Sequence, residues 1–381
     1  MKNGWTTNML ADVCEVFADG DWVESKDQSP EGIRLIQTGN VGKGIFKDRA
    51  EKARYISEAT FKRLRCTEIF EGDCLISRLP DPAGRSCILP DTGERMITAV
   101  DCTIIRFNSK QVIPEFFNYY TQSRDYLKDV DSETTGTTRK RISRSKLGEV
   151  QIPVPPLPEQ QRIVGILDKA FDGIATANAN AEKNLQNARA LFESRLQSVF
   201  TQRGTGWVEK TIAECFKVRS GDFLPARAMV DSGDFDVYGG NGINGKHDKK
   251  NLTGDNIIIG RVGAKCGNVR YVKGDLWVTD NAVFISEYLC PFDLRFLARL
   301  LERKDLRNRA NQMAQPVISY TTIKNVLLAF PVSTDEQKEI ANKLDTFEEE
   351  TQRLASLYER KIAAVEALKK SLLHQAFNGN L

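Results

Sequence analysis

Residues 158–200 read PEQQRIVGILDKAFDGIATANANAEKNLQNARALFESRLQSVF. Apolar or small residues follow one another here at steps of three and four, which places them in one continuous stripe along an α-helix. The stripe consists of Ile163, Leu167, Ala170, Ile174, Ala177, Ala181, Leu185, Ala188, Phe192, Leu196 and Val199. Pro158 suits the first helical turn, where a missing N–H group is tolerated. The pattern predicts a helix roughly 63 Å long, which is too long for a buried strut in a small domain.

A second segment, residues 335–377, predicts a helix of similar length. Its apolar positions are Ile340, Leu344, Phe347, Leu354, Leu357, Val365, Leu368, Leu372 and Ala376. Thr334 and Asp335 precede them as candidates for the N-cap. Two helices of this length, each with one apolar stripe, are most simply stabilised by packing together as a coiled coil. The alternative is a pair of unrelated surface helices.

Both helices belong to an internal duplication, which indicates two copies of one structural unit. The repeated elements are Gly4-Trp5 with Gly206-Trp207, Glu159-Gln160 with Glu336-Gln337, Leu167-Asp168 with Leu344-Asp345, and Phe200 with Phe377. The front part of the second copy is shorter, whereas the helical back parts agree in length. We therefore predict an α+β protein in which two similar mixed α/β domains are joined by two long helices that form an antiparallel coiled coil. The predicted borders are 1–155 and 206–332 for the front domains and 156–205 and 333–381 for the helices.

The two front domains share further short patterns. A turn, an apolar strand and an arginine recur at residues 72–78 and 254–261. Residues 116–125 and 296–305 each indicate a short amphipathic helix. A shared fold with different loops suits recognition of two different targets, because binding residues lie mostly on loops.

Composition describes a globular protein with more than one core. The chain has 381 residues, of which 41% are hydrophobic and 28% are charged, enough to bury two or more cores. It contains no apolar run long enough to span a membrane, and its first 20 residues lack the apolar core of a signal peptide. The eight cysteines are scattered without C-x-x-C spacing and there are two histidines, which argues against a metal site. We expect a cytoplasmic protein with free thiols and no membrane partner.

Residues 238–247, YGGNGINGKH, resemble a phosphate-binding loop. Gly240, Gly245 and Lys246 fit its pattern, but His247 stands where a hydroxyl residue would ligate Mg²⁺. The following sequence indicates a turn and a short strand over 256–259, whereas a phosphate loop leads into a helix. A Gly/Asn-rich hairpin is therefore the favoured interpretation, and a nucleotide-hydrolysing enzyme is the alternative.

Charge clusters, rather than the formal net charge of +3, indicate a nucleic-acid partner. Residues 137–146 combine cations with hydroxyl residues, the groups that contact phosphates, and residues 241–250 combine cations with asparagines, whose amides can read adenine edges. A solvated turn would explain either cluster alone. We predict DNA contacts by Arg78, Arg85, Arg139, Lys140, Arg141, Arg144, Asn241, Asn244, Lys246, His247, Lys249, Arg261 and Lys265. The sequence indicates no catalytic residue.

The order of these features resembles the specificity subunit of type I restriction-modification enzymes. The resemblance depends on PVPPLPEQQ at 153–161, Phe330-Pro331 before Glu336-Gln337, YGGNG at 238–242 and TDNA at 279–282. The motifs are short, but their order and duplication cover essentially the whole chain. The first copy has Gln37-Thr38-Gly39-Asn40-Val41 instead of YGGNG, so its base contacts are less well defined.

The resemblance implies two target recognition domains for double-stranded DNA, held apart by an antiparallel pair of conserved-region helices. It implies no catalysis and no cofactor on this chain. Two methyltransferase subunits would bring S-adenosylmethionine and adenine methylation, and two restriction subunits would bring ATP- and Mg²⁺-dependent translocation and cleavage. A stand-alone coiled-coil DNA-binding protein is the other alternative, besides the phosphate-loop enzyme.

If the helices set the distance between two half-sites on DNA, their length should set the spacer. Inserting four residues after Ala181 lengthens that helix by about 6 Å and roughly preserves its apolar face. We expect the distance between half-sites to grow by about one or two base pairs, at roughly 3.4 Å each, with the half-site sequences unchanged. Methylation mapping measures this. An unchanged spacer, or altered half-site bases, would show that the helices do not set the geometry.

Overall fold

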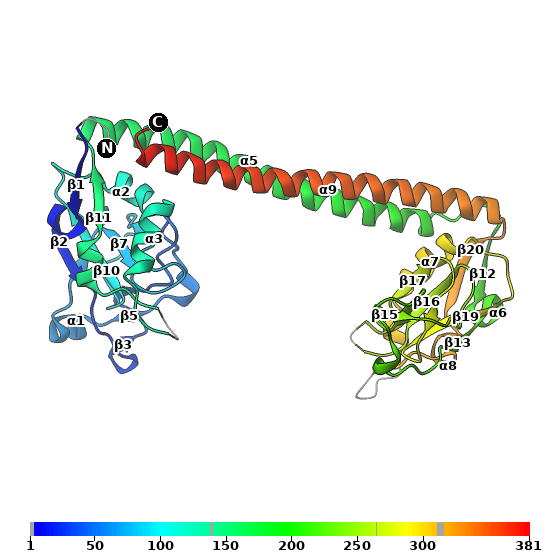
Figure 1. The fold of residues 1–381 in the computed structure, drawn as a ribbon. Helices are drawn as coiled ribbons and strands as arrows, with labels where there is room; N and C mark the ends of the chain where they lie inside the picture. The colour runs from blue at the N-terminus through cyan, green and yellow to red at the C-terminus, as the bar shows by residue number, and fades with distance from the viewer. Residues whose placement is uncertain (1–3, 138–139, 264, 311–315) are drawn as a thin grey trace. The chain divides into compact units, whose positions relative to one another are not determined.

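The computed structural model describes residues 4–137, 140–263, 265–310 and 316–381. The chain forms two compact units, of which the first contains residues 1–182 and 359–381 and the second contains 183–358. The predicted long helices are confirmed as α5 (Leu157–Thr201) and α9 (Thr334–Phe377), labelled in Figure 1. Each compact unit thus contains part of both helices. The domain borders predicted from the sequence, after residues 155, 205 and 332, instead separate the helices from the front domains, and they remain a prediction.

The described residues of the first unit form three sheets, which are antiparallel or mixed. One joins β1 (Thr6–Met9) to β11 (Gln151–Val154). A four-stranded antiparallel sheet has the order β2 (Cys14–Asp19), β10 (Cys102–Phe107), β7 (Cys74–Ser77) and β8 (Ser86–Ile88). A five-stranded sheet has the order β3 (Gln28–Ser29), β5 (Tyr55–Ile56), β4 (Ile33–Ile36), β9 (Met96–Thr98) and β6 (Glu68–Ile69). The helices are α1 (Glu58–Leu64), α2 (Pro114–Tyr120), α3 (Arg124–Ser132) and α4 (Arg144–Glu149).

The second unit repeats this plan with shorter connections. Strand β12 (Trp207–Thr211) pairs with β20 (Leu327–Pro331). The four-stranded sheet has the order β13 (Phe216–Ser220), β19 (Ala282–Tyr288), β16 (Asn256–Gly260) and β17 (Val269–Val272). The third sheet has the order β15 (Gly242–His247), β14 (Phe235–Gly239) and β18 (Trp277–Val278). The helices are α6 (Ile212–Cys215), α7 (Leu294–Glu302) and α8 (Tyr320–Ile323). The matching strand orders confirm the duplication predicted from the sequence.

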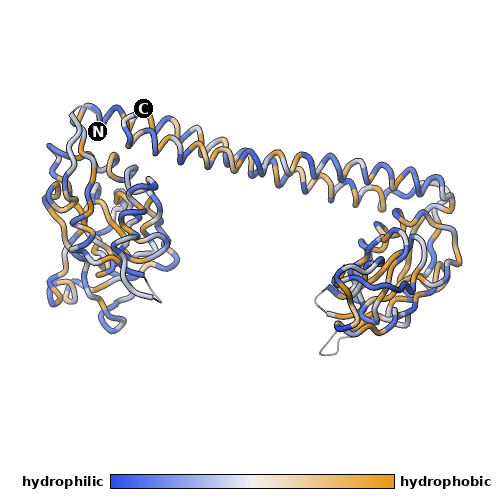
Figure 2. The backbone as a smooth tube through the Cα atoms, viewed as in Figure 1, coloured by the Kyte–Doolittle hydropathy of each residue, from blue (hydrophilic) through white to orange (hydrophobic). Residues whose placement is uncertain are grey.

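The long helices pack on each other with opposite directions. In the first unit, Ile163 and Leu167 near the start of α5 share a core with Leu373 and Phe377 at the end of α9. In the second unit the end of α5 shares a core with the start of α9. Cations also lie over rings across the helix pair, with Lys369 over Phe171 in the first unit and Arg195 over Phe347 in the second. Both hydrophobic and hydrophilic positions occur along each long helix in Figure 2. The shared cores at both ends confirm the predicted antiparallel pairing.

A buried glutamine explains the repeated Glu-Gln pair. Gln160 and Gln337 are both 0% exposed. The side-chain oxygen of Gln160 accepts a hydrogen bond from the backbone N–H of Ile113, the N-cap of α2, at 2.8 Å, and its amide nitrogen donates to the carbonyl of Pro155 at 2.8 Å. Gln337 accepts from the N-cap of α7 at 3.0 Å and donates to the carbonyl of Pro331 at 2.8 Å. In each copy one amide joins a strand end, a short helix and a long helix.

The predicted short helices differ from the observed ones at their ends. Residues 116–125 fall on two helices, because the chain leaves α2 at Tyr120 and Ser123 caps α3 by accepting from the N–H of Tyr126. In the second copy α7 ends at Glu302, before a left-handed Asp305. The start of α9 is capped by Ser333, whose hydroxyl accepts from the N–H of Glu336, rather than by Thr334 or Asp335. Among the described residues, no helix is long and apolar enough to cross a membrane.

Replacing Gln160 by alanine should loosen the attachment of α2. The change leaves the partly buried N–H of Ile113 and the buried carbonyl of Pro155 without their partner, which we expect to destabilise the first unit by about 2–4 kcal/mol. Hydrogen exchange at the Ile113 amide should accelerate, and the urea midpoint of the first unit should fall. Gln161→Ala is the matched control, because Gln161 is exposed on the same helix turn. Equal effects of the two substitutions would contradict this role.

Candidate nucleic-acid interface

Three strand ends of the second unit meet at one edge. The N–H of Thr279 donates to the carbonyl of Tyr238 at 2.8 Å, and the N–H of Arg261 donates to that of Asn281 at 3.0 Å. A Cβ atom at Gly240 would lie 2.9 Å from the carbonyl oxygen of Asn281, so this approach requires glycine. The YGGNG and TDNA segments, which are distant in sequence, are thereby neighbours. We name this surface, formed by residues 239–244, 261–263 and 279–281, the second strand-end edge.

The segment that resembled a phosphate loop is a β-hairpin, as the favoured interpretation predicted. Strands β14 and β15 pair antiparallel around the turn Gly240-Asn241, and Lys246 lies opposite Asp236 in this register. The Lys246 ammonium is 3.9 Å from the Asp236 carboxylate, and the His247 ring contacts Trp277 edge-on at 5.0 Å. No helix begins among the described residues between His247 and Asp293. The phosphate-loop alternative is therefore wrong, because Lys246 lies within a strand and not before a helix N-terminus.

The hairpin presents polar side chains to solvent. Asn241 at the turn is exposed, as are Lys246 and Asn244, and Asn244 is the extra residue of a β-bulge in β15. The backbone carbonyl of Asn241 accepts a hydrogen bond from Arg270 at 2.8 Å, which fixes the turn while leaving the Asn241 side chain exposed. Lys249 and Lys265 are exposed, and Arg261 is half-buried, with hydrogen bonds to Ser220 and the carbonyl of Asp280. The structure thus places Asn241, Asn244 and Arg261 on the second strand-end edge, whereas Lys246 and His247 lie toward the other end of the hairpin.

The first unit has an equivalent edge. The N–H of Ala99 donates to the carbonyl of Ile36 at 2.9 Å, and the N–H of Arg78 donates to that of Asp101 at 2.9 Å, as Thr279 and Arg261 do in the second unit. Residues 37–40 therefore occupy the place of 239–242. The Asn40 side chain is used to shape the loop, since it donates to the carbonyls of Lys47 and Asp48. We name residues 37–40, 78 and 99–101 the first strand-end edge.

Arg78 and Arg85 lie below this surface. Arg78 is 4% exposed, pairs with Asp19 at 3.0 Å and donates to the carbonyl of Val100. Arg85 is 9% exposed, and its guanidinium donates to the backbone carbonyls of Thr38, Val41, Leu79 and Pro82 at 2.7–2.9 Å. Burial lowers the pKa of both guanidinium groups below the ordinary value for arginine. Both side chains hold the loops in place. Because both are buried, neither offers an exposed N–H donor for the DNA contact that was predicted from the sequence.

The other predicted cations of the first unit that the structure describes are exposed and have carboxylate partners. Lys140 pairs with Asp131 at 2.9 Å, and Arg141 pairs with Asp101 at 2.9 Å. Arg144 lies 3.5 Å from Asp19, the same carboxylate that Arg78 uses. Arg139 lies outside the described residues. The charge of this cluster is therefore largely balanced within the domain.

A second basic segment was missed by the sequence analysis. Residues 43–54 read KGIFKDRAEKAR and join β4 to β5, the place that the turn Gly240-Asn241 takes in the second copy. Lys47, Arg49, Lys52 and Arg54 are exposed, and within the described residues none of them has an ion-pair partner. Asp48 is instead neutralised by the buried Arg34. The sequence shows these cations close together in residues 43–54, within the insertion that makes the first front domain longer than the second.

This basic loop borders a hollow next to the first strand-end edge. The hollow has a volume of about 410 Å³ and is lined by Gln37, Gly39, Asn40, Arg49, Lys52, Ala53 and Arg54. Unpaired guanidinium and ammonium groups beside amide side chains are suited to phosphate oxygens and base edges. This loop thus places several exposed cations without ion-pair partners next to the first strand-end edge, whereas the described cations at 140–144 are balanced by carboxylates.

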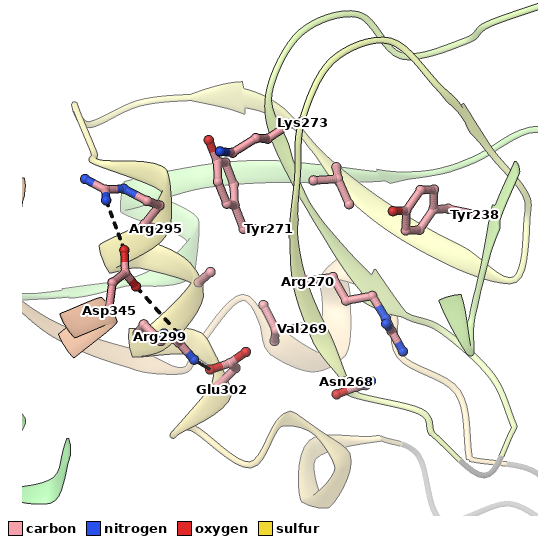
Figure 3. Close-up of a pocket in the computed structure, with 12 residues that line it drawn as sticks. Tyr238, Asn268, Val269, Arg270, Tyr271, Lys273, Arg295, Arg299, Glu302 and Asp345 are labelled. Atoms are coloured by element: carbon pink, nitrogen blue, oxygen red, sulfur yellow. Dashed lines mark hydrogen bonds and ion pairs between the residues drawn. The ribbon is translucent and has the colours of Figure 1, made fainter. Parts of the chain in front are cut away.

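A hollow in the second unit, beside the long helix α9, has a different character. Its volume is about 570 Å³, and Figure 3 shows it between β17, α7 and Asp345 of α9. Arg295 pairs with Asp345 at 3.0 Å, and Arg299 lies between Asp345, Glu302 and Glu348. Burial raises the pKa of the Glu302 carboxyl above its usual range. These ion pairs attach α7 to the long helix α9. In the first unit, the hydrogen bond from the Tyr119 hydroxyl to Asp168 attaches α2 to α5 in the same way.

Comparison with known proteins identifies the family. The profile of the Methylase_S family, described as the type I restriction modification DNA specificity domain, matches residues 2–186 and 204–360. The two matches cover most of the chain, one for each copy of the duplication. The chain belongs to this family and carries two of its DNA specificity domains.

Individual relatives agree with this assignment. The EcoprrI type I restriction enzyme specificity subunit of Escherichia coli is 29% identical over 209 residues, which are 51% of each chain. The putative type I specificity subunit S.MpnORF638P of Mycoplasma pneumoniae is 24% identical over 86% of this chain and 85% of its own length. In the first of these matches, the chain spans about half the length of its relative.

Solved structures share the fold. A chain from a structure of a type I restriction-modification system, determined to explain its assembly and conformational transition, has a TM-score of 0.80 at 17% identity. That similarity covers 100% of this chain and 99% of the other. The HsdS subunit of Thermoanaerobacter tengcongensis has a TM-score of 0.65 at 18% identity, with 100% and 98% coverage. The mixed architecture with long helices, predicted from the duplication, is confirmed.

Arg54 and Arg85 form a matched pair for testing the interface. We expect Arg54→Ala to change the free energy of unfolding by less than about 0.5 kcal/mol, because the side chain is exposed. It should weaken DNA binding and reduce the slope of log affinity against log salt by about 0.9 for each lost phosphate contact. Arg85→Ala should instead destabilise the first unit by about 3 kcal/mol or more, because four carbonyl bonds are lost. Urea unfolding and salt-dependent binding measure both. An unaltered salt slope for Arg54→Ala would contradict the assignment.

Proposed function

We propose that this chain is the DNA-reading subunit of a type I restriction-modification complex, which recognises a bipartite, asymmetric site. The observation that carries the proposal is the presence of two DNA specificity domains with equivalent strand-end edges and different loops. One edge carries the hairpin turn with Asn241 and Asn244, and the other carries the basic loop 43–54. Because the side chains offered by the two edges differ, each domain reads its own half-site.

The chemistry of the two edges supports base and phosphate contacts. Asparagine amides can donate to and accept from an adenine edge, and lysine or arginine can bind guanine or a phosphate oxygen. Phosphate contacts fix position along the duplex, and base contacts supply the sequence preference. In the second half-site, base and phosphate contacts are made by Asn241, Asn244 and Lys246. In the first half-site they are made by loop 43–54.

The chain acts without catalysis or a cofactor of its own. Its family and its relatives, which are named specificity subunits, support a role as the scaffold for other subunits. Two methyltransferase subunits would supply S-adenosylmethionine, and two restriction subunits would supply ATP and Mg²⁺ chemistry. This complex would act on double-stranded DNA in the cytoplasm. The other candidate, a stand-alone coiled-coil DNA-binding protein, lacks these partners.

Co-expression with methyltransferase genes that neighbour its own gene tests the proposal. We expect a stable complex that methylates adenine at a bipartite site. Asn241→Ala and Lys246→Ala should each weaken binding by about 1–3 kcal/mol, and only through the second half-site. A chain that binds duplex DNA but forms no complex would favour the stand-alone protein. Saturable ATP binding that Lys246→Ala abolishes would contradict the proposal.

A further inference from the structure

One exposed aromatic residue stands at the same place in each copy. Trp22 is 69% exposed and Phe223 is 74% exposed, more than any other large hydrophobic residue in the described part of the chain. Both follow a Gly-Asp pair, in GDW at 20–22 and GDF at 221–223. Single exposed hydrophobic residues are common and need no explanation. It does require an explanation that the two most exposed residues occupy the same place in both copies.

The backbone shows that the two positions are equivalent. The N–H groups of Gly20 and Asp21 donate to the carbonyls of Cys102 and Thr98 at 2.9 and 2.7 Å. In the second unit, Gly221 and Asp222 donate to Ala282 and Val278 at 3.1 and 3.0 Å. A Cβ atom at either glycine would collide with backbone carbonyls of the neighbouring strand end, at 98–99 or 278–279. Only glycine permits this approach, which holds the next residues beside the strand-end edge.

Neither aromatic side chain is needed for the fold. Trp22 and Phe223 belong to no hydrophobic core of the described residues, and the indole N–H of Trp22 donates a hydrogen bond to Glu24 at 3.4 Å. Their neighbours Asp21 and Asp222 do hold the structure, since Asp21 accepts from the N–H of Thr67 and Asp222 from the Asn251 amide. The aspartates therefore have a structural role in these loops. The fold gives no such role to the aromatic side chains beside them.

An exposed cation without an ion-pair partner among the described residues lies near Trp22 in space and near Phe223 in sequence. Trp22 borders a hollow of about 480 Å³ together with Arg54, and Arg54 also lines the hollow of the basic loop with Arg49 and Lys52. Trp22 thus lies beside the unpaired cation Arg54 and beside the ion pair of Lys26 with Glu24. Phe223 is followed by the exposed Arg227, which likewise has no ion-pair partner among the described residues. An aromatic ring bordered by free cations is complementary to a nucleic acid, with bases for the ring and phosphates for the cations.

We propose that Trp22 and Phe223 contact bases of the two half-sites, where each ring stacks on or inserts beside a base step while the adjacent cations bind phosphates. This rests on the proposed function, because it assigns two contacts of the same DNA. Aromatic residues that wedge into a duplex partly unstack the step they enter, and stacking on a ring tolerates any base. The two residues therefore contribute affinity and local DNA distortion, and the loops beside them contribute the choice of sequence.

The experiment uses the complex with its methyltransferase subunits and a duplex that carries the site found by methylation mapping. Trp22→Ala and Phe223→Ala should each lower affinity roughly 10- to 100-fold, with unchanged unfolding midpoints. Trp22→Phe should stay within about threefold of the unchanged protein, because phenylalanine holds this place in the second copy. Leu327→Ala, at an exposed apolar position on β20, is the matched control.

Permanganate footprinting of the bound DNA distinguishes base stacking by the rings from a simple loss of contact area. Permanganate oxidises unstacked thymines, so the unchanged complex should show enhanced reactivity in both half-sites. Trp22→Ala should abolish the enhancement in one half-site and Phe223→Ala in the other. Full affinity of both alanine variants would overturn this inference and leave the proposed function intact. Loss of methyltransferase co-purification with retained DNA binding would also overturn it, because the rings would then contact protein. Failure of the unchanged complex to bind any duplex would overturn the proposed function itself.

Discussion

Each copy of this protein depends on one buried side-chain amide. Gln160 and Gln337 are enclosed completely, and each bonds on both sides to the backbone. An unpaired amide in such a place would be costly, so the strand end, the short helix and the long helix must all stand where the amide can reach them. Glutamine satisfies this geometry because it carries a donor and an acceptor at one end of a flexible chain. The short Glu-Gln repeat therefore reflects the junction of each domain with its helix.

A rigid junction permits the opposite edge of each domain to vary. The four-stranded sheets keep the same strand order in both copies, and four backbone bonds at the first strand-end edge, from Gly20, Asp21, Arg78 and Ala99, have equivalents in the second copy. On this common frame, one copy carries the long basic loop 43–54 and the other a tight hairpin turn. Gly240 and Gly20 lie where a side chain would collide with a neighbouring strand, so the frame, and not the ligand, requires these glycines.

Charge has two different uses in the molecule. Arg85 lies under the surface and binds four backbone carbonyls, which shapes the loops around it. Arg299 joins α7 to α9 through carboxylates. Cations in these places stabilise the domain, and their positive charge is not offered to a partner. Arg49, Lys52 and Arg54 have no such partners among the described residues, which distinguishes a surface suited to phosphates from a surface that is merely charged.

The sequence alone determined the features that depend on local spacing and on repetition. The apolar stripes at steps of three and four predicted α5 and α9 almost to the residue, because helical periodicity is a local property. Duplicated pairs predicted the two-domain plan, and the glycines and asparagines of 239–244 predicted a hairpin. Only the tertiary structure decided which charges are available, because the partners of a cation come from distant segments. Arg78 meets Asp19, and Asp48 meets Arg34, through folding and not through sequence proximity. The equivalence of Trp22 and Phe223 likewise depends on strand ends that only the fold brings together.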